Sequence, residues 1–311
     1  MEKSNEKKTI TDFVSYRVID ENKKIYFEYK SVGPQSGVFE FTINDQLREK
    51  WQAAIDASIP VYLSESDIKP LVCIETFDLV DDNNYLLKLP TIPKNIEEMI
   101  NVRCWLEKLF KCAFDYCDFE KIVFNPEMIN ILFYNDKTIL PKFHADIPDL
   151  SPTNRTFENM SDFILNHLAN TRFLIINFIY VDNAEQYINI LFNILINEGD
   201  KFPRIRLERG KLTRLYDLIV EYIITATDFS KMITKIELDC MTFQNFRLPE
   251  RAENVEIGEL DVFDNRSTRY EIANIHNPRM RFAFSIDEDM RGLFWENLSI
   301  ISGINIIKKN D

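Results

Sequence analysis

The sequence predicts a mixed α/β fold in which repeated βα units form a mainly parallel, leucine-rich-repeat-like sheet with β-rich segments on either side. Hydrophobic residues make up 45% of the 311 residues, which is enough to bury a sizeable core. Strongly β-prone runs begin near residues 172, 204 and 233, about thirty residues apart. Apolar stripes at helical spacing fill the intervals between these runs.

The N-terminal portion, residues 1–93, is predicted to be β-rich. Its apolar and polar residues alternate with a period of two, which is typical of half-buried strands. One segment differs, because residues 45–57 place Leu47, Trp51 and Ala54 at helical spacing. Prolines at positions 90 and 93 end this portion and set a provisional domain boundary. The strands expected here are residues 14–19, 25–29, 38–43, 71–79 and 85–89.

The remainder, residues 94–311, is predicted to hold the repeated βα region and a β-rich C-terminal cap, and the whole chain is also compatible with one continuous domain. A wide apolar stripe predicts a long helix over residues 95–116. Residues 119–124 predict a short strand. A proline-bearing stretch, residues 140–152, predicts a loop before a helix over residues 157–168.

The middle of the chain carries the clearest regularity. Each predicted helix returns the chain to the same edge of the sheet, so the strands of such units are parallel neighbours, and we expect residues 120–124 to join them. Either an open α/β sheet or a leucine-rich-repeat-like curved stack satisfies this pattern. The series is strand 172–181, helix 184–196, strand 204–208, helix 212–225 and strand 233–239.

After residue 240 the chain returns to β structure. Asn277 and Pro278 predict a turn between two of the last strands. These strands are expected to cap the exposed edge of the parallel stack. They are residues 255–263, 268–273, 280–286 and 299–306.

Charge and composition exclude several classes of partner. With 50 acidic and 37 basic residues the formal net charge is −13, which repels the phosphate backbone of nucleic acids and anionic membranes. No apolar stretch reaches the length of about 18 residues that spans a bilayer, and the N-terminus lacks an apolar signal core. The sequence therefore predicts an intracellular protein, in the cytoplasm or the nucleus.

The cysteine count supports the same location. Five cysteines are an odd number, which favours buried, reduced thiols over a disulfide framework. A metal site would need closer cysteine pairs with histidine partners. The five are Cys73, Cys104, Cys112, Cys117 and Cys240.

No motif in the chain predicts catalysis or a cofactor. The seven glycines form neither a dinucleotide-binding G-x-G-x-x-G nor a P-loop, both of which need glycine for close backbone approach to phosphate. The three histidines lie far apart in sequence, and no G-x-S-x-G turn occurs. We therefore name no catalytic, cofactor-binding or metal-ligating residue.

Alternation along the predicted strands places a mixed charged strip on one face of the sheet. Ile205 and Leu207, like Ile236 and Leu238, are expected to face the covering helices. If the opposite face is open, its strip suits a polar or charged segment of a partner. The alternative is a face that is merely solvated or covered by a loop. The candidate partner-binding residues are Asn177, Arg204, Arg206, Glu208, Lys235, Glu237 and Asp239.

The order of elements resembles the region that follows the F-box in nematode F-box proteins. The resemblance rests on residues 95–240, with the segments KIVF, RFLIINFIYV, PRIRLE and TKIELD, and on residues 269–286. It implies a substrate-recruiting region in a cullin-type ubiquitin ligase, a protein partner, and a Skp-type adaptor as a second candidate partner. An F-box is a three-helix segment, whereas residues 1–45 predict strands, so the adaptor has no matching segment here.

Three classes of function remain open after these observations. The first is a non-catalytic protein-interaction module, the second a structural or scaffold α/β protein of unrelated ancestry, and the third an enzyme whose site has no recognisable motif. A concave pocket with clustered, shifted titratable groups would favour the enzyme. An open sheet face without a deep pocket would favour binding.

Overall fold

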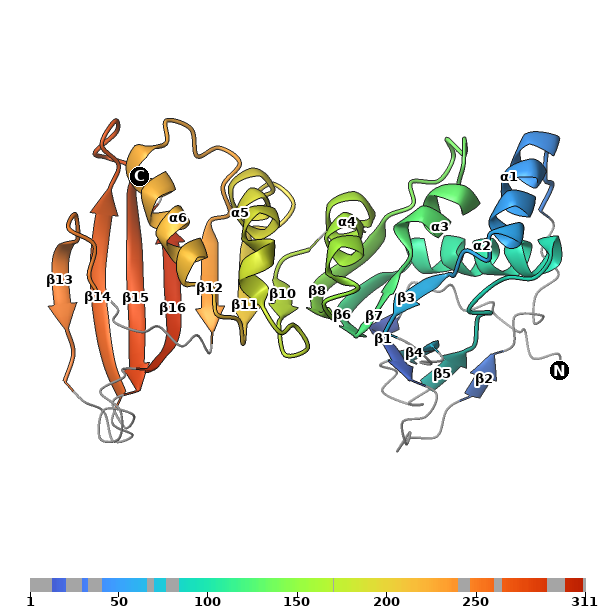
Figure 1. Ribbon diagram of the computed structural model, residues 1–311, viewed down its shortest axis with the longest axis horizontal. Helices are drawn as coiled ribbons and strands as arrows, with labels where there is room; N and C mark the ends of the chain where they lie inside the picture. The colour runs from blue at the N-terminus through green and yellow to red at the C-terminus, as the bar shows by residue number, and fades with distance from the viewer. Residues whose placement is uncertain are drawn as a thin grey trace, which may run out of the picture. The chain divides into compact units, whose positions relative to one another are not determined.

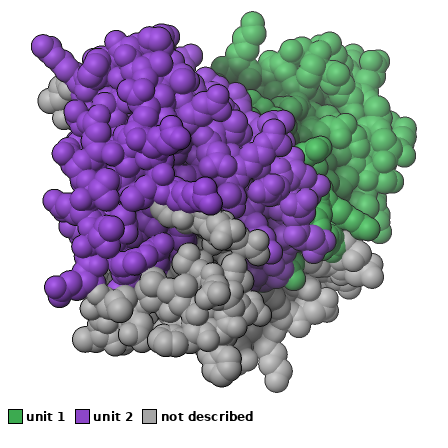
Figure 2. Space-filling model, turned by 60° about the vertical axis from the view of Figure 1, so that its left-hand side comes forward, with its two compact units in different colours: residues 1–171 green, residues 172–311 purple. Residues whose placement is uncertain are grey.

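The computed structural model describes residues 13–20, 30–32, 41–65, 70–76, 84–169, 171–239, 247–259, 265–289 and 300–309. Two compact units make up the chain, residues 1–171 and 172–311, and Figure 2 distinguishes them by colour. The provisional boundary at residue 93 falls inside the first unit. Strands from both sides of that position hydrogen-bond to one another there.

The first unit is built on a mixed sheet with the strand order β9-β8-β6-β1-β4-β5-β2. Its centre is parallel, because β1, β6 and β8 run in the same direction, while β4 pairs antiparallel with β1. A separate antiparallel pair joins β3 (Tyr62–Ser64) to β7 (Ile122–Phe124). The sheet strands are β1 (Phe13–Asp20), β2 (Lys30–Val32), β4 (Pro70–Thr76), β5 (Asn84–Leu87), β6 (Ala113–Glu120), β8 (Phe143–Ser151) and β9 (Leu168–Ala169).

The first two helices of the first unit begin at asparagine caps. The side chain of Asn44 accepts a hydrogen bond from the N–H of Leu47, and that of Asn95 accepts one from Glu98, which satisfies N–H groups that a helix leaves unpaired. These caps fix the starts of α1 (Asp45–Asp56) and α2 (Ile96–Phe110). Two more helices follow, α3 (Pro126–Leu132) and α4 (Phe157–His167).

Aromatic rings fill the core of the first unit. Tyr16 on β1 is fully buried, and its ring centroid lies 4.9 Å from that of Phe143 on β8. Phe114 stacks on the same Phe143 ring at 5.1 Å. Phe163 of α4 lies 5.6 Å from Phe119 of β6, ring to ring, so helix and sheet share one aromatic core.

Three sequence predictions in the first unit are wrong. The helix expected over residues 95–116 ends at Phe110, because residues 113–120 pair with two neighbouring strands as β6. The loop expected at 140–152 is mostly strand β8, which tolerates Pro148 inside it. Residues 119–124 are not one strand, since Lys121 takes φ of 60° and separates β6 from β7.

Several N-terminal expectations have different outcomes. The strands at residues 14–19 and 85–89 and the helix at 45–57 are confirmed within two or three residues. Residues 25–29 and 38–40 lie outside the described part of the chain, and residues 41–43 form no strand. Helix α3 and strand β3 were not predicted.

The second unit has a sheet of strand order β10-β11-β12-β16-β15-β14-β13. Its first three strands are parallel neighbours, as the thirty-residue spacing predicts, whereas residues 120–124 do not join them because β7 pairs with β3. Strand β16 pairs antiparallel with β12 and begins the β-rich cap. The strands are β10 (Leu174–Asn177), β11 (Arg204–Glu208), β12 (Lys235–Asp239), β13 (Glu253–Ile257), β14 (Asn265–Ala273), β15 (Arg281–Asp289) and β16 (Ile300–Lys308).

Helices cover one face of this sheet. The short 3-10 helix η2 (Ala184–Tyr187) leads into α5 (Ile188–Asn197), and α6 (Thr213–Thr225) follows β11; Figure 1 shows α5 and α6 over the same face. Tyr216 of α6 meets Tyr270 of β14 through hydroxyl oxygens 2.6 Å apart. Beneath the helices Ile205 and Leu207 are fully buried, as the alternation predicts.

Asn274 fastens the end of α6 to the sheet. Its side-chain amide Nδ2 lies 2.9 Å, 3.0 Å and 2.8 Å from the carbonyl oxygens of Ile223, Ile224 and Ala226, which a helix end leaves unpaired. Its Oδ1 accepts the N–H groups of His276 and Asn277 at the predicted turn between β14 and β15. One buried side chain therefore joins the helix layer to the cap.

Candidate functional site

The sheet face of the second unit that points away from α5 and α6 is called the open face here. The parallel register aligns Arg204 with Lys235, Arg206 with Glu237, and Glu208 with both Asn177 and Asp239. All seven candidate partner-binding residues therefore lie in three short rows on neighbouring strands. Their buried neighbours in the strands, such as Leu207 and Leu238, point to the helices.

Glu237 is the centre of an ion-pair network on this face. Its Oε1 lies 2.7 Å from Nη2 of Arg204 and 2.9 Å from Nζ of Lys235. Its Oε2 lies 2.8 Å from Nη2 of Arg206. Both guanidinium groups also lie over the ring of Phe173, with Cζ to centroid distances of 3.9 Å for Arg204 and 5.0 Å for Arg206. Three cations thus surround one carboxylate.

The network changes the titration of its members. Burial acts to raise the pKa of Glu237, but hydrogen bonds from Lys235 and Arg206 and the charge of Arg204 outweigh it and hold that pKa below its ordinary value. Burial acts to lower the pKa of Arg206, while Glu237, Glu208 and Asp239 raise it overall. Only 7% of the Glu237 side chain is exposed, against about a third of either arginine. Glu237 holds its neighbours in place and presents little surface to a partner.

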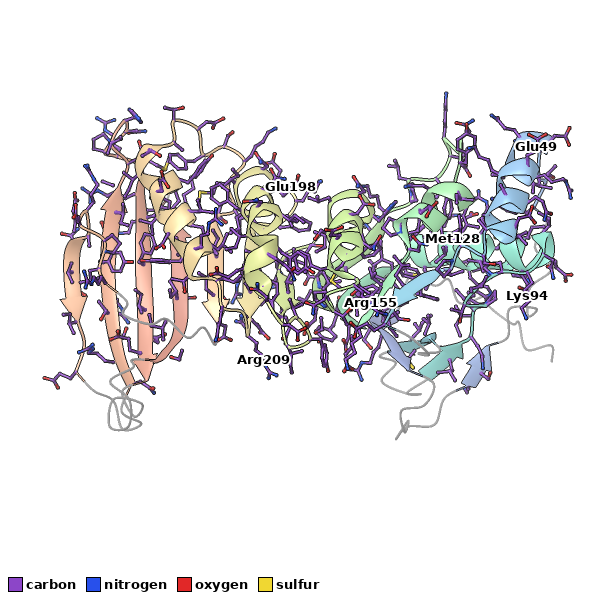
Figure 3. The ribbon with its side chains drawn as sticks, viewed as in Figure 1. Glu49, Lys94, Met128, Arg155, Glu198 and Arg209 are labelled. Atoms are coloured by element: carbon purple, nitrogen blue, oxygen red, sulfur yellow. The ribbon has the colours of Figure 1, made fainter. Side chains whose placement is uncertain are left out.

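Asn177 and Asp239 complete the strip in different ways. Asn177 donates from Nδ2 to Oε2 of Glu208, 3.1 Å away. Asp239 ends β12, and its carbonyl oxygen accepts the N–H of Arg209, a residue that Figure 3 shows beyond the carboxyl end of β11. The Asp239 carboxylate forms no ion pair with another described residue.

A groove lies beside this strip, over β15 and β16. Two adjoining hollows of about 330 and 260 Å³ share Asn305 of β16. Its floor has short side chains, including Ala283 and Ser285 of β15 and Gly303 of β16, whereas long charged side chains rise on either side. The walls are Arg206, Glu237 and Asp239 on one side and Glu256, Arg269 and Glu271 on the other.

Sequence analysis did not find this groove. Its floor depends on the pairing of β16 with β12, which brings residues about seventy positions apart into register: Glu237 with Asn305, and Asp239 with Gly303. One signal was present in the sequence. In β15 the outward positions Ala283 and Ser285 are small while the inward Phe282 and Phe284 are large, a pattern that predicts a low spot on the outer face.

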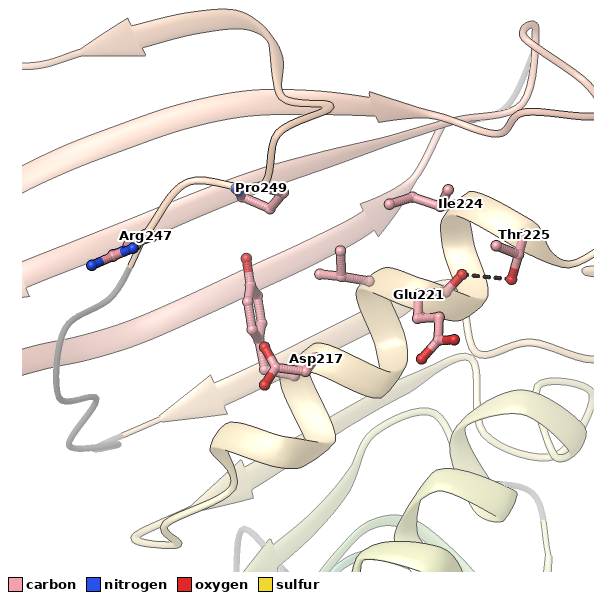
Figure 4. Close-up of a pocket in the computed structure, with 8 residues that line it drawn as sticks. Asp217, Glu221, Ile224, Thr225, Arg247 and Pro249 are labelled. Carbon is pink, nitrogen blue, oxygen red and sulfur yellow. Dashed lines mark hydrogen bonds between the residues drawn. The ribbon is translucent and has the colours of Figure 1, made fainter.

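A separate hollow of about 310 Å³ lies on the helix side of the unit, between α6 and residues 247–249 (Figure 4). Asp217 and Glu221 stand one helical turn apart at its edge, and Thr225 donates to the carbonyl oxygen of Glu221. Burial raises the pKa of Tyr216 to about 12, which keeps its hydroxyl protonated. Burial also raises the pKa of Asp217, and the nearby Glu185 carboxylate raises it further.

The four described cysteines are buried. Cys73, Cys104, Cys112 and Cys117 form no disulfide among the described residues, and burial raises the pKa of Cys112 to about 12. A protonated, buried thiol is a poor nucleophile. Cys240 lies outside the described residues.

In the part of the chain that the structure describes, no group of three or more His, Cys, Asp and Glu side chains is placed to hold a metal ion. No described helix is long and apolar enough to cross a bilayer.

Comparison with known protein families matches part of the chain. Residues 32–179 match a family described as a domain of unknown function, DUF8381. No curated protein and no solved structure matches the chain. The matched segment ends just after β10, so the ion-pair network around Glu237 and the groove over β15 and β16 lie beyond it. What the chain is similar to is therefore a domain family without an assigned activity, over slightly less than half its length.

Proposed function

We propose that this chain is a non-catalytic protein-interaction module, and that it holds its partner on the open face of the second unit. The observation that carries the proposal is the groove over β15 and β16, which is shallow, lined by both polar and apolar side chains and bounded by two charged walls. Protein interfaces combine a well-packed centre with a polar rim and with charges complementary to those of the partner, and they do not need an enclosed cavity. The ion-pair network forms one of those walls.

Two alternatives fit these observations less well. An enzyme needs a nucleophile or general base with a suitably shifted pKa, whereas Glu237, the most buried carboxylate of the ion-pair network, is held ionised by Arg204, Arg206 and Lys235. A purely structural protein has no need of a recess between two charged walls. The scaffold alternative can be tested, because it predicts that filling the groove changes no interaction, whereas the interaction module should then lose its partner.

We further propose the context of a cullin-type ubiquitin ligase, in which this chain would recruit a substrate in the cytoplasm or nucleus. The support is the resemblance to the region after the F-box in nematode proteins. A Skp-type adaptor would then be the second partner. Copurification from cells followed by reconstitution with the purified adaptor tests this, and an adaptor that fails to bind the purified chain would remove the ligase context while leaving the groove proposal intact.

The leucine-rich-repeat-like curvature of the sheet stays part of this proposal. Its support is the succession of three parallel strands joined by helices on one side, β10 to β12. In repeat proteins such a succession creates a concave binding surface on the strand face. Additional βα units would strengthen the likeness, but here antiparallel β16 follows the third parallel strand.

Filling the groove tests the interaction proposal. A Cβ placed on Gly303 would meet only the carbonyl oxygen of Leu238 at 3.9 Å, an ordinary contact, so Gly303→Trp should fold and occupy the recess. The matched control is Thr227→Trp on the exposed turn after α6. We expect proteins that copurify with the native chain to be lost with Gly303→Trp and kept with Thr227→Trp. Identical sets from both variants would contradict the proposal, provided that circular dichroism shows equal melting.

A further inference from the structure

The floor of the groove contains a gap between two carboxylates. The antiparallel pairings align Asp239 of β12 with Gly303 of β16, and Gly303 with Asp287 of β15. All three residues belong to one row on the open face. Because the middle residue has no side chain, the two aspartates flank an empty place on the sheet surface.

This gap is open space rather than strained packing. The position above Gly303 is free to hold atoms, since a Cβ there would lie 3.9 Å from its nearest neighbour, the Leu238 carbonyl oxygen. The hydroxyl of Ser302 donates to the Asp287 carbonyl oxygen, 2.9 Å away, which ties the two strands together at this point. Asn305, two residues along β16, provides a side-chain amide on the same face.

The charge at the gap is negative, and no ion pair with a described residue binds either carboxylate. Neither Asp239 nor Asp287 forms an ion pair with another residue in the described ranges. Arg206 of the wall forms ion pairs with both Glu237 and Glu208, and its interaction with Asp239 is through charge. The chain as a whole has a net charge of −13, so a cation for this gap is best supplied by another molecule.

Geometry decides which kind of cation fits. Strands two apart in a sheet stand about 10 Å from each other, too far for two carboxylates to share one small metal ion but suited to a guanidinium or ammonium group between them. The described residues also include no set of three acidic, histidine or cysteine side chains placed for a metal. A side chain of a segment bound in the groove can reach this gap from the solvent side of the open face.

We propose that the groove binds a segment of a partner protein that places an arginine or lysine side chain over Gly303, between Asp239 and Asp287. This inference rests on the proposed function and names the chemistry of the partner. The partner segment lies along the floor of β15 and β16, between the wall of Arg206 and Glu237 and the wall of Arg269 and Glu271. A second copy of this chain fits poorly, because two grooves facing each other leave a void where a convex segment would make contact.

Peptide display on the intact chain tests the inference. Random peptides are selected for binding to the native protein and against binding to Gly303→Trp. We expect the surviving peptides to share a basic residue. Their affinity should fall about tenfold or more for the double variant Asp239→Asn with Asp287→Asn, because each charged hydrogen bond that is lost weakens binding substantially.

A charge-matched control separates local from general electrostatics. Asp217→Asn with Glu221→Gln removes two negative charges from α6 on the helix side, and the affinity should change less than twofold there, since exposed charges at that distance are screened. Replacing the shared basic residue of the peptide by glutamine should cost the same factor as the Asp239/Asp287 double variant. The two losses should not add when combined, which is the signature of direct contact.

The outcomes distinguish this inference from the proposed function. Selected peptides without a basic residue, or with equal affinity for the Asp239/Asp287 variant, overturn the inference but keep the groove as a binding surface. A selection that yields no peptide sensitive to Gly303→Trp overturns both. Equal losses from the Asp239/Asp287 and Asp217/Glu221 variants would assign the effect to net charge and also overturn the inference.

Discussion

The two faces of the second-unit sheet differ in burial and in charge, although the same strands form both. On β11, Ile205 and Leu207 are completely buried under α5 and α6, while about a third of the side chains of Arg204 and Arg206 stays exposed on the other face. The covered face is closed by apolar packing and by Asn274, which holds α6 to the cap. The open face has charged walls and a low floor.

This difference teaches that neighbouring residues of one strand can have separate roles, because alternate side chains lie on the buried face and on the charged face. A strand presents alternate residues to opposite faces, so substitutions at neighbouring positions act on different properties. Apolar burial supplies the free energy of folding on one face. The ion pairs of the other face fix the positions of charged groups while contributing less to stability.

The largest effect should come from truncating the covered face. Leu207→Ala removes a fully buried side chain and is expected to lower the free energy of unfolding by about 2–5 kcal/mol, through lost burial and a cavity. Arg206→Ala, one residue away on the open face, should lower it by about 1 kcal/mol or less, since Glu237 keeps Arg204 and Lys235. Urea unfolding measures both.

The contrast between the two faces would be wrong if both variants lowered the free energy of unfolding by the same amount. An Arg206→Ala variant as unstable as Leu207→Ala would mean that the ion-pair network supports the fold, and the open face would then be structural. The slope of the unfolding free energy against urea concentration should be equal in both variants, because a changed slope reports a changed unfolded state instead.

A smaller, pH-dependent effect is expected at Glu237. Glu237→Gln leaves Arg204, Arg206 and Lys235 without their shared anion and should lower the free energy of unfolding at pH 7 by about 1–3 kcal/mol. The folded state holds the pKa of Glu237 below its ordinary value of 4.5, so its contribution is present above that pH and is lost as the pH falls through the folded-state pKa. The difference in unfolding free energy between the native protein and Glu237→Gln should therefore shrink as the pH is lowered from 7 to 3.

Glu256→Gln provides the control for this pH dependence. Glu256 lies on the same face, but on the exposed strand β13, and its substitution should change stability by less than about 0.5 kcal/mol at pH 7. A Glu237→Gln difference that persists unchanged at pH 3 would contradict the assigned network, because a protonated glutamic acid offers the cations no more than glutamine does.

Local patterns determined which parts of the fold were predictable. Strand β11 was predicted with its observed bounds, because the sequence RIRLE alternates fully between buried and exposed positions. Ala113 and Phe114 extended the apolar stripe of the preceding helix, yet they belong to β6, whose partners β1 and β8 are distant in sequence. Pro148 locally predicts a break in a strand, but pairing with neighbouring strands overrides that local preference.

The candidate site likewise has one part that local sequence patterns predict and one part that they do not. The contact between Arg206 and Glu237 follows from parallel register between successive βα units and was therefore within reach of the sequence. The groove was not, because it needs the C-terminal strand to insert beside β12 rather than at the end of the sheet. No local signal in β16 specifies that partner. Long-range strand order thus limits what sequence patterns can say about this surface.

The smallest effect tests the gap at Gly303 directly. Gly303→Ala should raise the free energy of unfolding by about 0.4–1 kcal/mol, because alanine restricts the unfolded chain and its Cβ meets only ordinary contact in the folded one. Gly199→Ala is the opposite case, since a Cβ there would lie 2.5 Å from the Met232 carbonyl oxygen and must displace backbone. Thermal unfolding measures both effects, and the melting temperature should rise for Gly303→Ala and fall for Gly199→Ala. A Gly303→Ala variant that melts below the native protein would show that the place between Asp239 and Asp287 is already filled, and no partner side chain would then fit there.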